Sequence, residues 1–444
     1  MNPFKFFFKM LRRRAALPPP LPPTPPLMLP KQTQLMLIIV ILLTSLLILS
    51  PSLRRRLKAL RGQVQLYFLT SKPPSTDTSR KILSLHTYPL KACQGLDPQS
   101  VSLTPHGLKH DRVLMIARSG SNPDAPKRFF TQRQCGALAT IKVEEVPSTT
   151  ATTATTYKLS SSILPRSTPP LQVQYPPSPS PSPSPAPLTS VILWDDNLNV
   201  IDMGDSAAAF ITNIVNHYEA PTRSSLPPKI SVHGSLRLVA FAPEANCRFP
   251  NPVYFPSTAL TLSGIPPQSA LSDGFPILIT TTASLRDLNE RIAKRVGVVA
   301  PSKEPISMER IFKDKISKQN PPPPPVMTMD RFRPNIVIEN DVPWEEDSWR
   351  IIRINGQIFH VVKGCPRCKQ SCTDQKTGEV TEEPVETLKT FRCMSALHPD
   401  DVYFGQNVST TGMGLVSVGD IVEVLVRDEQ GEGVWDKGTI DAGV

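Results

Sequence analysis

The sequence has 444 residues, of which 50 are proline, and a formal net charge of +11 at pH 7. The length allows two ordinary domains, but proline-rich stretches bury too little apolar surface to fold, so about 320 residues are expected to form a folded body. Residues 1–62 contain eleven basic and no acidic side chains, whereas the rest of the chain is balanced, which argues against a nucleic-acid-binding body.

An uncharged apolar run at residues 35–49 follows a proline-rich stretch and precedes a cluster of basic residues at 54–61. Its length is near the lower limit for a helix that spans a bilayer. A cleaved signal peptide is the alternative, but that would begin with a short basic segment, and here a long stretch precedes the run. We predict that residues 1–62 form a basic, proline-rich N-terminus with a transmembrane anchor at about 35–50, and that the body faces the cytosol.

The first folded domain is predicted over residues 80–265. Strand-like and helix-like patterns indicate two strands, a hairpin and a helix, at residues 82–90, 113–117, 191–200 and 206–217. A threonine-rich stretch that becomes a Ser-Pro repeat interrupts this domain. We predict that it is a disordered insert at about 146–188, because such sequences rarely form a packed core.

The second domain is predicted over residues 266–430, with a short proline-rich insert at about 300–328. We expect Ser284 to cap a helix that ends at Gly297, with Asp287 completing the cap. Asn355-Gly356 predicts a hairpin turn. The remaining expected elements are a strand, a short helix and a pair of strands, at residues 275–280, 384–391 and 415–426. Many short strands with few helices predict a mainly β (α+β) fold with barrel-like architecture.

Three cysteines, Cys365, Cys368 and Cys372, lie within eight positions directly after the second arm of this hairpin. The chain has seven cysteines, and an odd number in a cytosolic body argues against a disulfide framework. Structural zinc requires a fourth ligand, which only Cys393 could supply, and an iron–sulfur cluster also requires four thiolates. Two interpretations stay open. The cysteines form an inert thiol cluster, or one of them binds a metal that needs a single protein thiolate because its cofactor brings the other sulfurs.

Nine motifs occur in order along the chain: YPLKACQG (88–95), GLKHDRVLMI (107–116), FFTQRQ (129–134), SDGFPILI (272–279), ASLRDLN (283–289), FRPNIVI (332–338), WEEDSW (344–349), CPRC (365–368) and YFGQN (403–407). Together they resemble the MOSC family, and within it the mitochondrial amidoxime-reducing components, which are membrane-anchored molybdenum enzymes. The resemblance covers residues 80–427 apart from the inserts. It implies an N-terminal MOSC-type β-barrel domain followed by a C-terminal MOSC domain with a barrel-like sheet and a few short helices.

The resemblance also implies site residues. The second cysteine of the CxRC motif ligates molybdenum in that family, and it falls on Cys368. The residues that would bind the cofactor, by its phosphate above all, are Lys91, Ala92, Arg112, Arg333, Asn335 and Arg367. Asp273, which precedes a strand, is a candidate proton donor near the metal on its position in the sequence alone, and a capping carboxylate is the alternative. The family commonly has serine where this chain has Ala92, and often tyrosine where it has Asn407.

As function, the resemblance implies a molybdenum-cofactor-dependent oxidoreductase that reduces N-hydroxylated compounds such as amidoximes, hydroxylamines and hydroxamic acids. Electrons are expected from NADH through cytochrome b5 reductase and cytochrome b5. The expected location is the mitochondrial outer membrane, with the endoplasmic reticulum as the alternative. Pyridoxal phosphate binding enters only as a family-level association.

Two other functions stay open at this point. The body could handle cofactor sulfur, as the MOSC part of molybdenum-cofactor sulfurases does, although the pyridoxal-phosphate desulfurase domain of those enzymes is not recognisable here. A non-enzymatic, membrane-tethered adaptor could instead recruit partners through its proline tracts. Molybdenum content separates the reductase from the adaptor.

Overall fold

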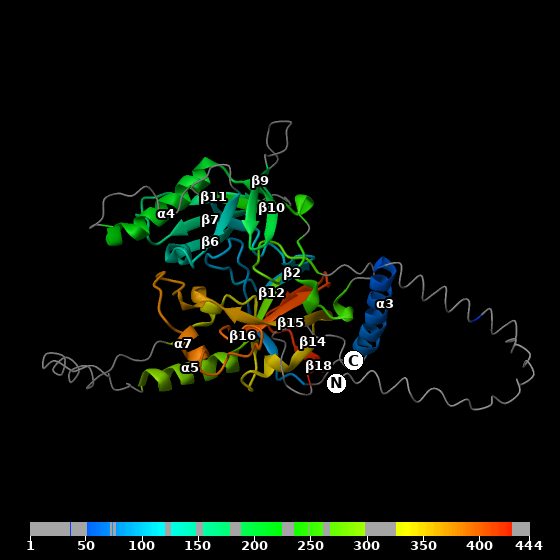
Figure 1. Cartoon of the computed structure of the whole chain (residues 1–444). Coiled ribbons are helices and arrows are strands. Elements are labelled where there is room, and N and C mark those ends of the chain that lie inside the picture. Colours follow the sequence, from blue (N-terminus) through cyan, green and yellow to red (C-terminus); the bar gives the residue numbers. More distant parts are fainter. Residues whose placement is uncertain are drawn as a thin grey trace, which may run out of the picture. The chain divides into compact units, whose positions relative to one another are not determined.

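A computed structural model describes residues 36, 51–71, 73, 77–119, 126–147, 154–177, 188–223, 235–246, 248–260, 267–297 and 326–428. The predicted anchor at about 35–50 lies outside these ranges except for Met36, as does almost all of the predicted insert at 300–328. Within the described ranges, no helix combines the length and the hydropathy needed to cross a membrane. The fold is mainly β with few helices, as predicted (Figure 1).

Five strands close into a barrel in the order β10-β11-β4-β5-β9. Their bounds are β4 (Leu114–Arg118), β5 (Lys127–Phe130), β9 (Leu188–Leu193), β10 (Asp196–Asp202) and β11 (Leu236–Phe241). The predicted hairpin is confirmed, because β9 and β10 pair antiparallel across a turn at Trp194. The predicted helix is α4 (Asp205–Arg223), which buries Ile211 and Ile214 in the apolar cluster that it shares with β11.

Part of the predicted disordered insert is folded. Residues in that range form β7 (Thr155–Ser161) and β8 (Leu171–Tyr175), which extend β6 (Ile141–Val146) into a three-stranded sheet. Tyr157 and Leu159 on β7 and Val173 on β8 are buried in the same core as the barrel. Their alternation with polar residues is a strand pattern, which the surrounding threonines and prolines obscure. The remainder of the predicted insert lies outside the described residues.

A second, seven-stranded sheet has the order β1-β13-β12-β16-β15-β14-β18. Its strands are β1 (Lys81–Leu85), β12 (Ile277–Thr281), β13 (Ile336–Glu339), β14 (Trp349–Ile354), β15 (Gln357–Arg367), β16 (Val402–Thr410) and β18 (Val422–Arg427). The predicted Asn355-Gly356 hairpin is confirmed as β14 and β15. A β-bridge between Lys81 and Ile421 brings the two edges of the sheet together, so the sheet curls towards closure.

Segments from the predicted first domain complete the core of this second sheet. Strand β1 pairs with β13, and β2 (Ser100–Thr104) pairs with both β3 (Gly107–Leu108) and β17 (Leu415–Ser417). Ile82, Leu103 and Leu108 are buried with residues of β12 to β16. The chain therefore passes through the second sheet before it builds the barrel.

Further helices with bounds among the described residues are α3 (Pro51–Thr70), α5 (Thr282–Gly297) and α7 (Val385–Leu388). Helix α7 begins directly after Pro384 and contacts α5 and β16. The predicted cap on α5 is wrong, because the helix already begins at Thr282. The Ser284 and Asp287 side chains instead contact Glu346 and the indole of Trp344.

Candidate active site

A cavity of about 280 Å³ lies where the barrel-side loops meet the second sheet. The sequence-predicted site residues all line it: Lys91, Ala92, Arg112, Asp273, Arg333, Asn335, Arg367 and Cys368. They come from five separate parts of the chain, so tertiary folding alone brings them together. The volume is close to the lower end of the range, about 300–1,000 Å³, that small-molecule sites usually occupy.

The sulfur wall of the cavity is the end of β15 together with the 3-10 turn η7 (Lys369–Cys372). Cys365 lies within β15, and burial raises the pKa of its thiol. Cys372 is buried, points its Sγ to the carbonyl of Glu382 at 3.5 Å, and does not line the cavity. Cys368 lies directly after β15, where it is exposed and lines the cavity. It is therefore the thiol best placed to reach a ligand.

The four-ligand alternatives do not assemble in the described part of the chain. Cys393 is exposed, lies outside the cavity lining and contacts the carbonyl of Lys389. Across the described residues, no group of three or more His, Cys, Asp or Glu side chains could hold a metal ion. A metal here would need ligands that a cofactor brings with it.

The cationic wall centres on Arg333, which follows the 3-10 turn η5 (Met329–Phe332). Arg333 is 6% exposed, and its Nη1 donates to the carbonyl of Cys93. Its Nη2 is buried without a hydrogen-bond partner among the described residues. Burial lowers the pKa of Arg333 to about 10, so the guanidinium stays charged at neutral pH. A buried cation with an unused donor strongly favours an anion in the cavity.

Three residues of the cationic wall have left-handed backbone conformations. The φ angles of Ala92, Arg112 and Arg333 are 64°, 47° and 54°. Such angles are uncommon for residues other than glycine and cost about 1–3 kcal/mol each, and they cluster at functional sites. Here they turn the chain so that the two guanidinium groups reach the cavity.

Tyr88 separates the two arginines. The Cζ atoms of Arg112 and Arg333 lie 4.5 and 4.2 Å from the centre of its ring. The negative faces of an aromatic ring attract cations, so the ring stabilises two like charges that would otherwise repel. Burial raises the pKa of the Tyr88 hydroxyl, which keeps it neutral.

Asn335 acts on the cavity through Arg112. Its Oδ1 accepts from Arg112 Nη1 at 2.9 Å and from the backbone N–H of Leu278 at 3.1 Å. Its Nδ2 donates to the carbonyl of His86 and to Asp111 Oδ1 at 3.2 and 3.0 Å. The amide is thus fully bonded within the protein and orients Arg112, whose Nη1 also donates to Asp111 at 2.6 Å.

Lys91 and Asp273 form an ion pair on the barrel side of the cavity. Lys91 Nζ lies 2.7 Å from Asp273 Oδ1 and donates to the carbonyl of Leu271, also at 2.7 Å. Burial lowers the pKa of Lys91 to about 8, against the opposing effect of Asp273. Withdrawal from solvent raises the pKa of Asp273, but Lys91 and a hydrogen bond from Trp194 outweigh this and hold it well below its usual range. In this arrangement Asp273 is an ionised partner of Lys91 and a poor proton donor.

The guanidinium group of Arg367 donates its hydrogen bonds to carbonyl groups of the protein. Its Nε and Nη2 donate to the carbonyl of Phe404 at 2.9 and 2.6 Å, and its Nη1 donates to the carbonyl of Phe332 at 3.0 Å. Phe332 precedes Arg333, and Arg367 itself precedes Cys368. One guanidinium therefore ties the turn that carries the buried cation to the strand that carries the exposed thiol.

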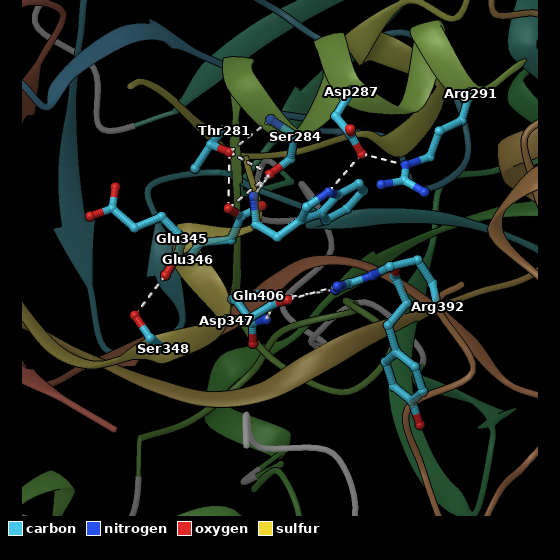
Figure 2. Close-up of polar contacts among 12 residues, drawn as sticks. Thr281, Ser284, Asp287, Arg291, Glu345, Glu346, Asp347, Ser348, Arg392 and Gln406 are labelled. Carbon is cyan, nitrogen blue, oxygen red and sulfur yellow. Dashed lines mark hydrogen bonds and ion pairs between the residues drawn. The ribbon is translucent and has the colours of Figure 1, made fainter. Parts of the chain in front are cut away.

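The turn η6 (Glu345–Ser348) braces β16, which pairs with β15 of the sulfur wall (Figure 2). Asp347 accepts from Arg392 at 2.7 and 3.1 Å and from Gln406 at 2.7 Å. Arg392 Nε in turn donates to the carbonyl of Tyr403 at 3.0 Å. Two residues of β16 are therefore held through one buried carboxylate, next to the Phe404 carbonyl that Arg367 holds.

Glu346 lies in the same turn and is fully buried. Its Oε2 accepts from the hydroxyls of Thr281 and Ser284 at 3.0 and 2.9 Å, as Figure 2 shows. Its Oε1 has no hydrogen-bond partner among the described residues. Burial, together with the neighbouring Asp347, raises the pKa of Glu346 to about 7, so the protonated form is stable well above the usual range.

Three residues that support the cavity escaped prediction as site residues. Gln132 and Gln375 exchange amide hydrogen bonds at 2.9 and 3.0 Å, and Gln132 also donates to the carbonyl of Ala92 at 2.8 Å. Arg248 holds the loop before β12 by donating to the carbonyls of Ala270 and Asp273 at 3.2 and 2.6 Å. Gln132 lies inside the FFTQRQ motif, which could have identified it from the sequence. No motif marks Gln375 or Arg248.

These residues fit a molybdenum cofactor. The unpaired Nη2 of Arg333 suits a phosphate oxygen, and guanidinium groups bind phosphate without losing charge. Cys368 offers one exposed thiol that lines the same cavity. Ala92 offers no side-chain donor; its carbonyl is already held by Gln132.

Comparison with known proteins agrees with this architecture. Residues 79–218 match the MOSC N-terminal beta barrel domain, and residues 266–423 match the MOSC domain. The chain is 26% identical to mitochondrial amidoxime-reducing component 1 of Mus musculus over 357 residues, which covers 78% of this chain and 82% of the relative. It is 24% identical to mitochondrial amidoxime reducing component 2 of Bos taurus over 360 residues, covering 78% and 83%.

A shorter match involves a different enzyme. Over 60 residues, 14% of this chain and 8% of the relative, the chain is 45% identical to the molybdenum cofactor sulfurase of Anopheles gambiae. With its barrel, its curled second sheet and the two domain matches in order, the chain belongs to the MOSC-domain family.

Proposed function

We propose that this protein is a molybdenum-cofactor-dependent reductase of N-hydroxylated compounds such as amidoximes, hydroxylamines and hydroxamic acids. The observation that carries the proposal is one cavity with an exposed thiol, Cys368, on one wall and a buried cation with an unused donor, Arg333, on the other. The relatives that match most of the chain are named amidoxime-reducing components.

The residues of the cavity have distinct parts in this proposal. Cys368 holds the metal, and a nearby metal favours the thiolate form of a cysteine. Arg333 and Arg112 bind the phosphate end of the cofactor, and Lys91 adds a third positive charge. When bound, the cofactor supplies the two-electron chemistry that removes oxygen from an N–O bond.

The source of the protons follows from the same geometry. Asp273 is held ionised by Lys91, which makes it unsuitable as the donor. Lys91, with a pKa of about 8, can carry a proton at neutral pH. Gly274, Phe275 and Lys363 also line the cavity, and they leave a partly apolar space in which a small organic substrate can lie.

Electron supply and location are parts of the proposal that rest on the family. We infer that cytochrome b5 and NADH-cytochrome b5 reductase provide electrons, and that the protein is held at the mitochondrial outer membrane with its body in the cytosol. The names of the matching relatives support a mitochondrial location.

The test combines metal analysis with turnover. The purified protein is expected to hold about one molybdenum per chain and to reduce benzamidoxime with a chemically reduced viologen, and then with NADH and the two cytochrome b5 proteins. Cys393→Ala is the matched control for Cys368→Ala, because both thiols are exposed but only Cys368 lines the cavity. Bound molybdenum without benzamidoxime reduction by viologen would refute the reductase.

A second candidate is the handling of cofactor sulfur, which the short match to a molybdenum cofactor sulfurase favours. That function predicts transfer of sulfur from a persulfide donor to the bound cofactor. The reductase predicts turnover with no sulfur donor, so assays with and without a persulfide source separate the two.

A further inference from the structure

Helix α3 is attached to the folded body by one face. Ala59 is fully buried, and a side chain at Gly62 would lie 2.3 Å from the Ser257 carbonyl, so the two backbones touch there. Gln63 Nε2 donates to the carbonyl of Leu260 at 2.7 Å. This face of α3 is therefore fixed against η4 (Ser257–Ala259).

The opposite face of α3 exposes large apolar side chains. They are Leu57, Leu60, Val64, Tyr67 and Phe68, with exposed fractions of 45, 52, 49, 68 and 66%. At about 100° per residue these positions form one stripe about 100° wide, which points directly away from Ala59 and Gly62. We call this stripe the outer face of α3. Such a continuous apolar face on an otherwise attached helix indicates an interaction surface.

Basic residues border the outer face on both sides. Arg61 lies at one edge, with Lys58 further round the helix on the same side, and Arg56 lies at the other edge; all three are exposed. The helix contains no acidic residue from Pro51 to Thr70. Long basic side chains can lay their alkyl stems along an apolar surface and keep their charge in water. The surface is therefore complementary to something apolar beneath a layer of negative charge.

We propose that the outer face of α3 lies on an anionic lipid surface, with its apolar side chains between the headgroups and its basic residues against lipid phosphates. Amphipathic helices with cationic borders bind membranes in this way. In the sequence the apolar run at residues 35–49 ends just before α3 begins. A second copy of the chain fits poorly, because a self-contact would bring the basic borders of two helices together.

This surface is separate from the cavity and from the predicted anchor. The contact would fix the orientation of the folded body on the membrane, because Ala59, Gly62 and Gln63 hold α3 to the body. Since the predicted anchor could itself retain the chain in vesicles, the experiment must report on α3 locally and not on vesicle binding.

The full chain is reconstituted into vesicles of phosphatidylcholine, with or without phosphatidylserine. The photo-crosslinking residue p-benzoylphenylalanine replaces Tyr67, or Leu397 as the control, because Leu397 is similarly exposed at 63%. We expect cross-links from position 67 to lipid, several-fold more than from position 397, and more in vesicles with phosphatidylserine.

A charge variant tests the basic border. Arg56→Gln, Lys58→Gln and Arg61→Gln together are expected to lower the lipid cross-link at position 67 by roughly tenfold or more in anionic vesicles. The matched control changes three exposed basic residues elsewhere, Lys109→Gln, Arg128→Gln and Lys376→Gln, and should leave the yield unchanged. Lipid cross-linking at position 67 no greater than at 397, or cross-linking to protein instead, would overturn the proposal whatever the enzymatic activity.

Discussion

The two walls of the cavity are built in opposite ways. The cationic wall places Arg112 and Arg333 on strained left-handed turns and packs both against one tyrosine ring, with Arg333 buried and Arg112 partly buried. The sulfur wall leaves Cys368 exposed at the end of a regular strand. The contacts that order this wall are made by Arg367 and by the Asp347–Arg392 pair. In the proposed function, recognition of the cofactor's charge depends on burial, whereas metal ligation depends on access. Substitutions in the two walls are therefore expected to have different effects.

The largest effect is expected at Cys368. Cys368→Ala removes the exposed thiol, so benzamidoxime reduction should fall to background. Cys365→Ser should keep much of the activity, because that thiol is held within β15 and burial raises its pKa. Steady-state turnover with a viologen donor measures both. The opposite ranking would assign the metal to Cys365.

The next test concerns the Asp347–Arg392 pair, which braces β16. Arg392→Met leaves Asp347 buried without its main partner, which typically costs about 3–5 kcal/mol in the free energy of unfolding. Arg291→Met is the matched control, because Arg291 also pairs with an aspartate and lies over an aromatic ring, but it is 44% exposed. That change should cost under about 1 kcal/mol. Chemical denaturation of both variants measures the difference, and equal losses of stability would contradict a bracing role for Arg392.

On the cationic wall, Arg333→Gln should weaken binding of the cofactor by about 2–3 kcal/mol, roughly a hundredfold. Its effect on the cofactor-free protein should be small, because the change removes a buried charge with an unused donor. Arg331→Gln provides the contrast, since Arg331 also lines the cavity but donates to Cys372 and Asp374. It should affect folding more than retention of molybdenum. Similar metal loss in both variants would contradict a special role for Arg333.

The smallest predicted effect depends on pH. The pKa of Glu346 is about 7 in the folded protein, against 4.5 for an ordinary glutamate. Between these values the folded state keeps a proton that the unfolded chain loses, so stability declines as pH rises through this window and stays lower above it. Glu346→Gln should remove this decline, whereas the exposed Glu290→Gln should preserve it.

Thermal unfolding between pH 5 and 8 measures the Glu346 effect. An unchanged pH profile in Glu346→Gln would show that the carboxyl group is ionised in the fold or that water reaches its unpaired oxygen. Because Glu346 and Asp347 share one turn, the same profile also reports whether the brace responds to protonation.

Local sequence signals predicted the regular elements where the pattern was self-contained. Asn355-Gly356 located the β14–β15 hairpin, and the apolar spacing around Ile211 located α4. Prediction failed where composition hid an alternating pattern, as in β7 and β8, and where tertiary contacts override a local motif. Ser284 matches a capping residue, but its hydroxyl is used by the buried Glu346.

The family motifs identified the site residues, but they did not predict which interactions each residue makes. Asn335 and Arg367 resemble cofactor ligands in sequence, yet their donors are bonded to carbonyls and side chains that lie far away in the chain. Gln375 and Arg248 hold the cavity without any motif, since their partners are set by the way two sheets meet. Which donors remain free is a property of the fold, and Arg333 Nη2 could be identified only there.

The most direct test of the central claim is X-ray absorption at the molybdenum edge of the purified protein. We predict that Cys368→Ser removes one sulfur from the metal environment relative to the unaltered protein, while Cys365→Ser leaves the sulfur count unchanged. An identical sulfur environment in Cys368→Ser and the unaltered protein would contradict the account, because the exposed thiol would then not be the ligand.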